Sequence, residues 1–433
     1  MYMRTSFLYI ALMCSFFISA QQTPGPAQNQ SILIQNATIH VGNGSVIENA
    51  NLGFIDGKIS YIGQENPIKK YDQIIKGEGK HIYPGLIALN TTLGLGEIDA
   101  VRATIDDDEL GSFIPHVRSV IAYNAESKVV ESMRMNGVLI AQIVPKGGTI
   151  SGSSSVVNLD AWNWEDAAIS IDQGVHLNWP SPYTRQRYSR GQSTTYEKNE
   201  KYQQSIEEIK NFFDSSRAYL KDPYPVSLPY QAMSKALNNE AKVYLHADDP
   251  QQIKDGVEFL KNQDIDGVVL VSAIYSSEIA DFLAQNNIEI AVKQPHNLPS
   301  LEDEDPKIRF KLASELLKNK VLLSIDSTGE MSRMNTRNLP FFAGSFAAYG
   351  LTKEEALQSI TLNAAKILAI DKNYGSLEIG KSATLFISSG DALDMRTNDV
   401  SQAFIDGRKV SLETHQTKLW KRYQKKVEEE KSN

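Results

Sequence analysis

The chain has 433 residues, of which 41% are hydrophobic, and this length can bury a barrel-sized core together with a small companion domain. Its formal net charge is −8 and basic residues gather only in the C-terminal tail, so nucleic acid and anionic lipid are not expected partners. The one cysteine, Cys14, lies near the N-terminus, so a chain that has lost this segment has no disulfide framework.

The N-terminus has the layout of a secretory signal. Arg4 precedes an apolar run from Ser6 to Ala20, and a polar stretch that contains proline follows up to Gln30. This order of charge, apolar run and small residue predicts a signal peptide over residues 1–20 and a linker over 21–30. An uncleaved anchor is the weaker alternative, because a transmembrane helix usually needs about 20 apolar residues. We therefore expect export to the periplasm or beyond, without a stable membrane anchor.

Short strand-like runs with turn signals occupy both ends of the remaining chain, residues 31–82 and 371–412. Each end carries an Asp-Gly pair, Asp56-Gly57 and Asp406-Gly407, which is a strong hairpin signal. Two β-rich ends around a long middle predict one small β-sandwich domain built from both ends, with a second domain inserted between them.

The middle, residues 83–370, alternates strand-like and helix-like runs, which predicts βα units and a parallel sheet. We expect an α/β chain with a (β/α)8 TIM-like barrel, because the competing open doubly wound sheet lacks its glycine-rich phosphate turn after the first strand. Residues 150–196 are too irregular to assign the fourth barrel strand. The assigned strands are Val138–Pro145, Lys242–Ala247, Gly267–Ala273, Ile288–Val292 and Val321–Asp326.

Two strand ends carry side chains suited to hydrolytic chemistry. His246 follows Val243-Tyr244-Leu245, and Asp326 closes the run that begins at Val321. Active-site groups of barrels project from the C-terminal ends of strands, where a metal ion can lower the pKa of bound water and a carboxylate can take its proton. The plain alternative is that each side chain only hydrogen-bonds loop backbone.

The run Tyr83–Leu93 resembles the first barrel strand of the amidohydrolase superfamily, in which Pro-Gly leads into an apolar run that ends in His-x-His. Here the two histidine positions read Asn90 and Thr92. The segments Gly350–Leu357 and Gly375–Phe386 are similar to the last barrel helix and the return to the β domain in imidazolonepropionase-like members. The chain is thus identified as a divergent member without the His-x-His motif.

This resemblance implies roles for the strand-end residues. His246 matches the fifth-strand metal histidine, and Asp326 matches the eighth-strand aspartate, which acts as general base and metal ligand. The sixth-strand histidine is missing, because Val271-Ser272 stands near its place. Asn90 and Thr92 are expected to contact substrate instead of metal. Since catalytic zinc normally has three protein ligands, the alternatives are one divalent metal such as zinc with an unidentified third ligand, or no metal.

Lys146-Gly147-Gly148 begins a loop rich in glycine and serine, directly after the strand that ends near Pro145. Its glycines permit close approach of the backbone, so we expect this loop to bind a substrate oxyanion or carboxylate with Lys146 as the countercharge. A flexible connector is the equal alternative.

Residues 413–433 place Trp420, Tyr423 and Val427 at helical spacing among many charged residues. This pattern predicts an amphipathic helix that docks on the body of the protein.

Two functions stay open. The first is hydrolysis of carbon–nitrogen bonds other than peptide bonds, at an incomplete or rebuilt metal site. The second is a catalytically inactive homologue that keeps a pocket for a small molecule or a partner, as a homodimer or paired with an intact homologue. A stoichiometric metal that His246→Ala abolishes would favour the first function.

Overall fold

The computed structural model describes residues 24–186, 195–299, 304–328 and 331–432. The predicted signal peptide, residues 1–20, and the first part of the linker therefore lie outside the described residues. Among the helices of the described ranges, none is long and apolar enough to cross a membrane.

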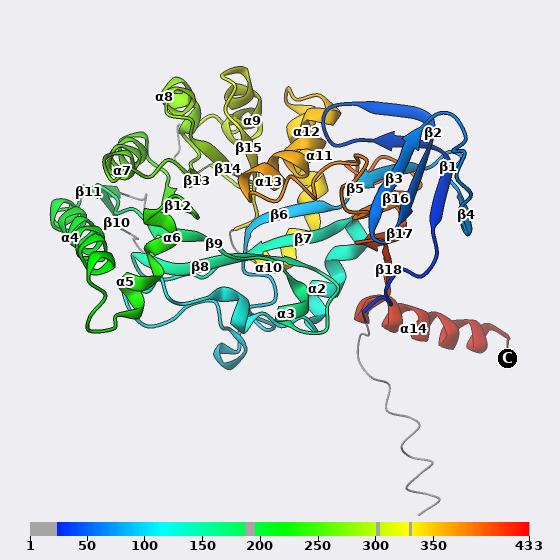
Figure 1. Cartoon of the computed structure of the whole chain (residues 1–433), viewed down its shortest axis with the longest axis horizontal. Helices are drawn as coiled ribbons and strands as arrows, with labels where there is room; N and C mark the ends of the chain where they lie inside the picture. The colour runs from blue at the N-terminus through cyan, green and yellow to red at the C-terminus, as the bar shows by residue number, and fades with distance from the viewer. Residues whose placement is uncertain (1–23, 187–194, 300–303, 329–330, 433) are drawn as a thin grey trace, which may run out of the picture.

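The two ends of the chain meet in one eight-stranded sheet beside a barrel (Figure 1). Its strands are β1 (Ile32–His40), β2 (Val46–Ile55), β3 (Lys58–Gly63), β4 (Gln73–Lys76), β5 (His81–Pro84), β16 (Leu385–Ser388), β17 (Val400–Ile405) and β18 (Arg408–Val410). The order is β18-β17-β16-β5-β1-β2-β3, with β4 on β1, so strands from the two ends pair directly at β16 and β5. Both Asp-Gly hairpins are confirmed, because β2 pairs antiparallel with β3 and β17 with β18.

The middle of the chain closes into a barrel, which confirms the predicted fold class. Its strands are β6 (Leu86–Thr91), β7 (Val138–Ile143), β8 (Ile150–Asn158), β9 (Ala168–Asn178), β12 (Lys242–Ala247), β13 (Val268–Ser272), β14 (Glu289–Lys293) and β15 (Leu323–Asp326). They neighbour one another in chain order, and β15 closes on β6.

Helices cover the outside of the barrel and link its strands (Figure 1). The longer ones are α4 (Tyr202–Lys221), α7 (Pro250–Asn262), α9 (Ile308–Lys318) and α11 (Leu339–Ala348). The shorter ones are α2 (Lys128–Met133), α3 (Trp164–Ala167), α5 (Leu228–Ala232), α6 (Ser234–Leu237), α8 (Ala280–Gln285), α10 (Ser332–Asn335), α12 (Lys353–Ser359) and α13 (Leu362–Ile367). A two-stranded ribbon, β10 (Tyr183–Gln186) and β11 (Thr195–Lys198), leaves the barrel after β9.

One barrel strand runs against the others. β8 pairs antiparallel with both β7 and β9, whereas the remaining neighbours are parallel. The reason is chain length: only residues 144–149 separate β7 from β8, and a parallel crossover needs a dozen or more residues. This reversal explains why the region 150–196 showed no βα pattern in the sequence. It also places the loop that begins at Lys146 at the same end of the barrel as His246 and Asp326.

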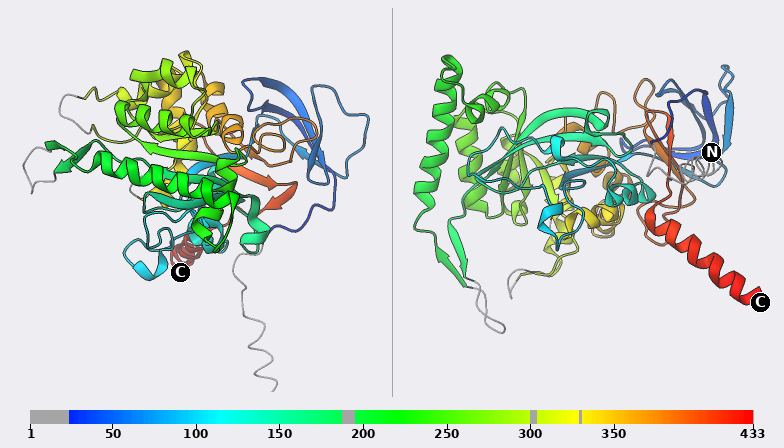
Figure 2. Two further views of the ribbon diagram at one scale, coloured as in Figure 1. Left: turned by 60° about the vertical axis from the view of Figure 1, so that its left-hand side comes forward. Right: turned by 90° about the horizontal axis from the view of Figure 1, so that it is seen from below.

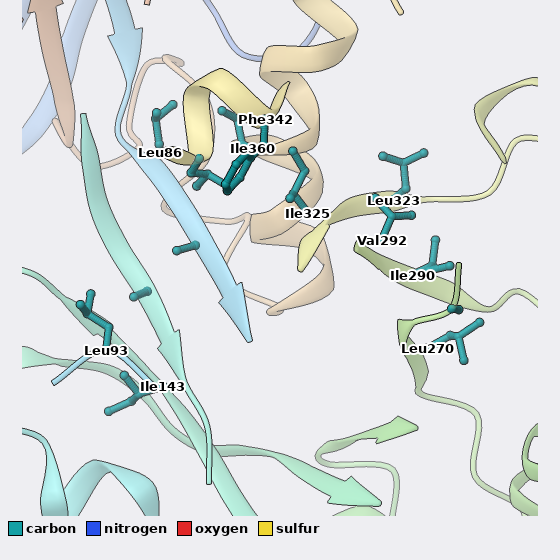
Figure 3. Packing of buried hydrophobic residues seen from close by; sticks show 14 of the residues in the cluster. Leu86, Leu93, Ile143, Leu270, Ile290, Val292, Leu323, Ile325, Phe342 and Ile360 are labelled. Carbon is teal, nitrogen blue, oxygen red and sulfur yellow. The ribbon is translucent and has the colours of Figure 1, made fainter. Parts of the chain in front are cut away.

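Alternation along the strands sorts side chains between the lumen of the barrel and the helices outside. On β14, Ile290 and Val292 face outward and belong to the same hydrophobic cluster as Leu323 and Phe342, and Figure 3 shows Val292 beside Leu323. Ala291 between them belongs to the inner cluster. That inner cluster includes Ile87, Leu89, Val269, Val271 and Ala291 from strands, and Ala364, Ala365 and Ile367 from α13.

The C-terminal helix α14 (His415–Ser432) extends away from the body (Figure 2). The helix agrees with the sequence pattern, but its predicted docking does not, since residues 420–431 are all exposed. Trp420, Tyr423 and Val427 are 63%, 57% and 47% exposed. Their stripe spans only two turns between lysines, arginine and glutamates, too little apolar surface to bury this helix.

Candidate functional site

The C-terminal ends of the parallel barrel strands bring together several of the predicted site residues. Asn90 from β6 and Asp326 from β15 are both fully buried and hydrogen-bonded to each other. His246 from β12 lies instead beside His176 from β9, a residue that the sequence did not single out. The site therefore has an aspartate side and a histidine side.

Four hydrogen bonds fill the Asp326 carboxylate. Oδ1 accepts from Asn90 Nδ2 at 2.9 Å and from the Thr328 backbone N–H at 2.9 Å. Oδ2 accepts from the Thr328 hydroxyl at 2.6 Å and from Ser272 Oγ at 3.0 Å. Burial raises the pKa of Asp326, and the bonds from Thr328, Asn90 and Ser272 oppose this shift. All four donors are uncharged groups, and a carboxylate has about four acceptor positions.

The backbone turns these donors toward Asp326. Asn90 has a φ of 53° and Ser272 a φ of 75°, both in the left-handed region, and Ala273 follows with 38°. The pairing of β6 with β7 slips by one residue between Ala88 and Thr91, which is a β-bulge. Strict alternation between Ala88 and Thr91 therefore does not hold. Non-glycine residues in this region store strain of order 1–3 kcal/mol and cluster at functional sites.

Thr91 and Thr92 follow Asn90 at the end of β6. Thr91 Oγ1 lies 3.1 Å from Thr336 Oγ1, outside the strand. Thr92 is fully buried, and within the described part of the chain its hydroxyl has no hydrogen-bond partner. Asn90 Oδ1 is also buried without a partner there, so two acceptors remain beside the filled carboxylate.

A chain of hydrogen bonds crosses the barrel from Asp326 to Tyr244. Gln142 of β7 accepts from the Asn90 N–H at 3.1 Å and donates to Ser154 Oγ of β8 at 3.0 Å. Gln173 of β9 donates to the same Ser154 Oγ at 3.3 Å. Gln173 Oε1 accepts from the Tyr244 hydroxyl at 3.2 Å. The polar belt thus consists of Tyr244, Gln173, Ser154, Gln142, Asn90 and Asp326.

The polar belt occupies part of a lumen that aliphatic side chains usually fill in TIM barrels. Each amide in it has one orientation that satisfies both neighbours, so the direction of the donors is defined. A buried hydrogen-bond network of this kind is rigid, and losing one member leaves others unpaired. The belt therefore holds Asn90 and Asp326 in place from within the barrel.

His176 and His246 form the other side of the site. His176 Nδ1 lies 2.9 Å from His246 Nε2, and the His176 ring stacks on Tyr244 with centroids 4.7 Å apart. A side chain at Gly174 would meet the Tyr244 ring at 2.3 Å, so this stack needs a glycine there. Burial lowers the pKa of His246 to about 4, and burial together with His246 lowers that of His176 well below its usual value. Both imidazoles are neutral at pH 7, which lets one donate to the other.

The loop at Lys146-Gly147-Gly148 is fixed by contacts of its backbone and of the Lys146 side chain, so it is not a free connector. Asn178 Nδ2 donates to the Gly148 carbonyl at 2.9 Å. Lys146 Nζ lies 3.4 Å from Asp107 Oδ2, and Arg333 contacts the same carboxylate oxygen at 3.3 Å. Gly147 and Gly148 have φ values of 81° and 59°, which only glycine adopts readily. Lys146 is thus already paired with a carboxylate at this end of the barrel.

The residues present do not fit a catalytic metal of the kind that the resemblance implies. Throughout the described ranges, no group of three His, Cys, Asp or Glu side chains is arranged to hold a metal ion. The acceptor positions of Asp326 are occupied by neutral donors, and one nitrogen of each histidine is occupied by the contact between His176 and His246. Asn90 and Ser272, near the places of expected histidines, provide an amide and a hydroxyl instead.

His176 could have been found from its strand. Gly174-Val175-His176-Leu177-Asn178 alternates apolar and polar residues, as half-buried strands do. Gln142, inside the apolar run of β7, was a second signal, because a buried amide in a strand needs partners across the barrel.

The fold and this site define a class: a TIM-like barrel inserted in a composite sheet, with polar groups gathered at the C-terminal strand ends. The model of the amidohydrolase family matches residues 159–410, more than half of the chain, and the protein belongs to that family. The resemblance seen in the sequence is confirmed.

Known relatives agree at the level of the family. The chain is 24% identical over 421 residues to a 5-methylthioadenosine/S-adenosylhomocysteine deaminase of Thermoanaerobacter pseudethanolicus, covering 86% of this chain and 91% of that one. Its fold is similar to an amidohydrolase from Thermotoga maritima, with a TM-score of 0.75 at 21% identity over 88% of this chain and 99% of that one. Its fold is also similar to that of an adenosine deaminase from Xanthomonas campestris with bound zinc. The TM-score is 0.53 at 14% identity, and the match covers 90% of this chain and 95% of that one.

Proposed function

We propose that this protein is a small-molecule-binding member of the amidohydrolase family that does not hydrolyse its ligand through a metal-bound water. The observation that carries this proposal is the Asp326 carboxylate, whose acceptor positions are filled by Asn90, Ser272 and Thr328. A general base must have a lone pair free for the proton that it takes. Two of these donors stand near positions where the family resemblance implies histidine ligands.

Binding is supported by buried polar atoms that lack partners in the described part of the chain. Asn90 Oδ1, Thr92 Oγ1 and His176 Nε2 are buried without a hydrogen-bond partner in the described part of the chain. Buried polar atoms without partners cost about 1–3 kcal/mol each, so they are normally satisfied by water or ligand. All three come from residues at the C-terminal ends of barrel strands, where ligands of this fold bind.

A second candidate is hydrolysis of carbon–nitrogen bonds other than peptide bonds, which the deaminase relative favours. Within the site, the observation that favours it is the pair of neutral histidines, since His176 and His246 already lie 2.9 Å apart. Hydrolysis at Asp326 would require Asn90 or Ser272 to release the carboxylate.

Export to the periplasm or beyond, and a homodimer or pairing with an intact homologue, are part of this proposal. Export rests on the composition of residues 1–20. Pairing with an intact homologue would fit a chain that binds a small molecule while the homologue catalyses its reaction.

The deciding measurement is the metal content of purified wild-type protein and of His246→Ala, grown with zinc, manganese and iron available. His296→Ala is the matched control, because His296 is an exposed loop histidine bonded to Ser345. We expect far less than one metal per chain in all three proteins and no turnover of amides, cyclic amides or 5′-methylthioadenosine. About one metal per chain, lost only in His246→Ala and accompanied by turnover, would establish the hydrolase instead.

A further inference from the structure

Lys293 ends β14 at the mouth of the barrel, and the sequence analysis did not single it out. It is paired in register with Asp326 of β15, so both residues sit at the same level of the barrel. Ile290 and Val292 pack outward, as Figure 3 shows, whereas Ala291 belongs to the inner cluster. Since alternate strand residues share a face, Lys293 lies on the lumen side with Ala291.

At the opposite end of β14, another charged side chain on the lumen face is paired within the protein. Glu289 shares the face of Ala291 and Lys293, at the N-terminal end of β14. Its carboxylate forms an ion pair with Lys242 of β12, and both side chains are about one-quarter exposed or less. The charge at the N-terminal end is therefore neutralised by the protein itself.

Lys293 has no such partner among the residues that the structure describes. It is partly buried, and within the described ranges its ammonium group forms no ion pair or hydrogen bond. The two other cations noted near this end, Lys146 and Arg333, both contact Asp107. Within the described ranges Lys293 forms no ion pair with Asp326, and the four acceptor positions of that carboxylate are occupied by other donors.

We propose that Lys293 anchors an anionic oxygen group, a carboxylate or a phosphate, of the small molecule that this barrel binds. This inference rests on the proposed binding function and names the class of its ligand. An ammonium group offers three donors and no acceptor, so an anionic oxygen is its natural partner in a partly buried site. Asn90 Oδ1, which has no partner among the described residues, would accept an N–H or O–H group from the rest of the ligand, and His176 Nε2 would donate or accept according to its tautomer.

The test compares matched acid and amide probes on purified protein. Benzoate, phenyl phosphate and benzamide share one ring and differ in charge, and their affinities are measured by titration calorimetry. The proteins are wild type, Lys293→Met, which keeps the length of the side chain, and Lys320→Met, which removes an exposed lysine that precedes β15. Unfolding temperatures of all three proteins show that the variants fold.

We expect at least one acid to bind the wild type and Lys320→Met with equal affinity. The same acid should bind Lys293→Met roughly tenfold to hundredfold more weakly, because one charged hydrogen bond is lost. Preference for benzoate or for phenyl phosphate decides which acid group the site takes. Equal binding of the acids to Lys293→Met, binding of benzamide alone, or no binding of either acid would overturn the proposal. Proton NMR on the same samples reports whether benzamide is converted to benzoate, which would contradict the proposed function separately.

Discussion

Thr328 and Thr92 give a matched pair of buried or partly buried hydroxyls at the site. Thr328 donates its hydroxyl to Asp326 at 2.6 Å, whereas Thr92 Oγ1 has no partner among the described residues. We expect Thr328→Val to lower the free energy of unfolding by about 1–3 kcal/mol, because a carboxylate loses a strong donor. Thr92→Val should change it by less than about 0.5 kcal/mol, or raise it. Urea unfolding at pH 7 measures both, and equal losses would show that Asp326 does not depend on its donors.

The pKa of His246 predicts how stability depends on pH. Burial lowers this pKa to about 4 from its ordinary value near 6.5, so between these values the unfolded chain binds a proton that the folded chain does not. The contribution of His246 is therefore complete above pH 6.5 and declines as the pH falls toward 4, with a slope of at most about 1.4 kcal/mol per pH unit.

His246→Gln should make this decline shallower while leaving stability above pH 7 with little dependence on pH. Asp326, whose pKa is raised, remains in both proteins and cancels in the comparison. The pKa of His176 is lowered by burial and in part by His246, so the variant also loses that part of the His176 shift, which makes the decline shallower still. Urea unfolding at steps from pH 4.5 to 8 tests this. Parallel curves for wild type and variant would mean that folding does not lower the pKa of His246.

At the scale of elements, the polar belt joins six barrel strands through side chains. Gln142 is its centre, because it contacts Asn90 of β6 and Ser154 of β8. We expect Gln142→Leu to cost about 2 kcal/mol, since it leaves the Asn90 N–H buried and unpaired. The exposed Gln204→Leu on α4, which loses only a contact with Glu208, is the control and should stay within about 0.5 kcal/mol.

A double-mutant cycle of Gln142→Leu with Ser154→Ala then measures the coupling within the belt. Residues in one hydrogen-bond network couple by about 0.5–3 kcal/mol, whereas independent sites add. Additive losses would show that Gln142 and Ser154 act separately and that the belt is not one network.

At the scale of the whole molecule, the C-terminal helix contributes little to the fold. Residues 421–431 are all exposed, and the ion pairs Lys425–Glu429 and Lys426–Glu430 lie within the helix itself. Removing residues 421–433 should change the free energy of unfolding by less than about 0.5 kcal/mol. As a control, Leu357→Ala on α12, where the leucine is 1% exposed, should cost about 2–5 kcal/mol. A loss of stability on truncation that grows with protein concentration would instead place this helix in an interface between chains.

Much of the architecture could be predicted from the sequence because it rests on local patterns. Asp56-Gly57 and Asp406-Gly407 form the turns that their chemistry favours, since both residues of each pair have positive φ. Thr352 and Glu355 make the capping box that starts α12, through bonds between residues three apart. The strands from β12 to β15 agree with their apolar runs to within about two residues, the usual uncertainty of element ends.

The site was less predictable, because its contacts join residues far apart in the chain. Asn90 meets Asp326 across 236 positions, and His176 meets His246 across 70. The turn of Asn90 toward Asp326 also depends on the β-bulge between Ala88 and Thr91, and a bulge cannot be predicted from the periodicity of side chains.

By itself the sequence determined the barrel, the sheet formed by both ends, and the absence of the His-x-His pair, because periodicity, turn residues and residue identity are all local properties. Only the tertiary structure decided that β8 runs backward, that neutral donors fill Asp326, and that Lys293 stands at the mouth of the barrel without a partner among the described residues. These features depend on which strands are neighbours and on where each backbone bends. They are set by closure of the barrel, since closure alone brings the first strand, β6, against the last, β15.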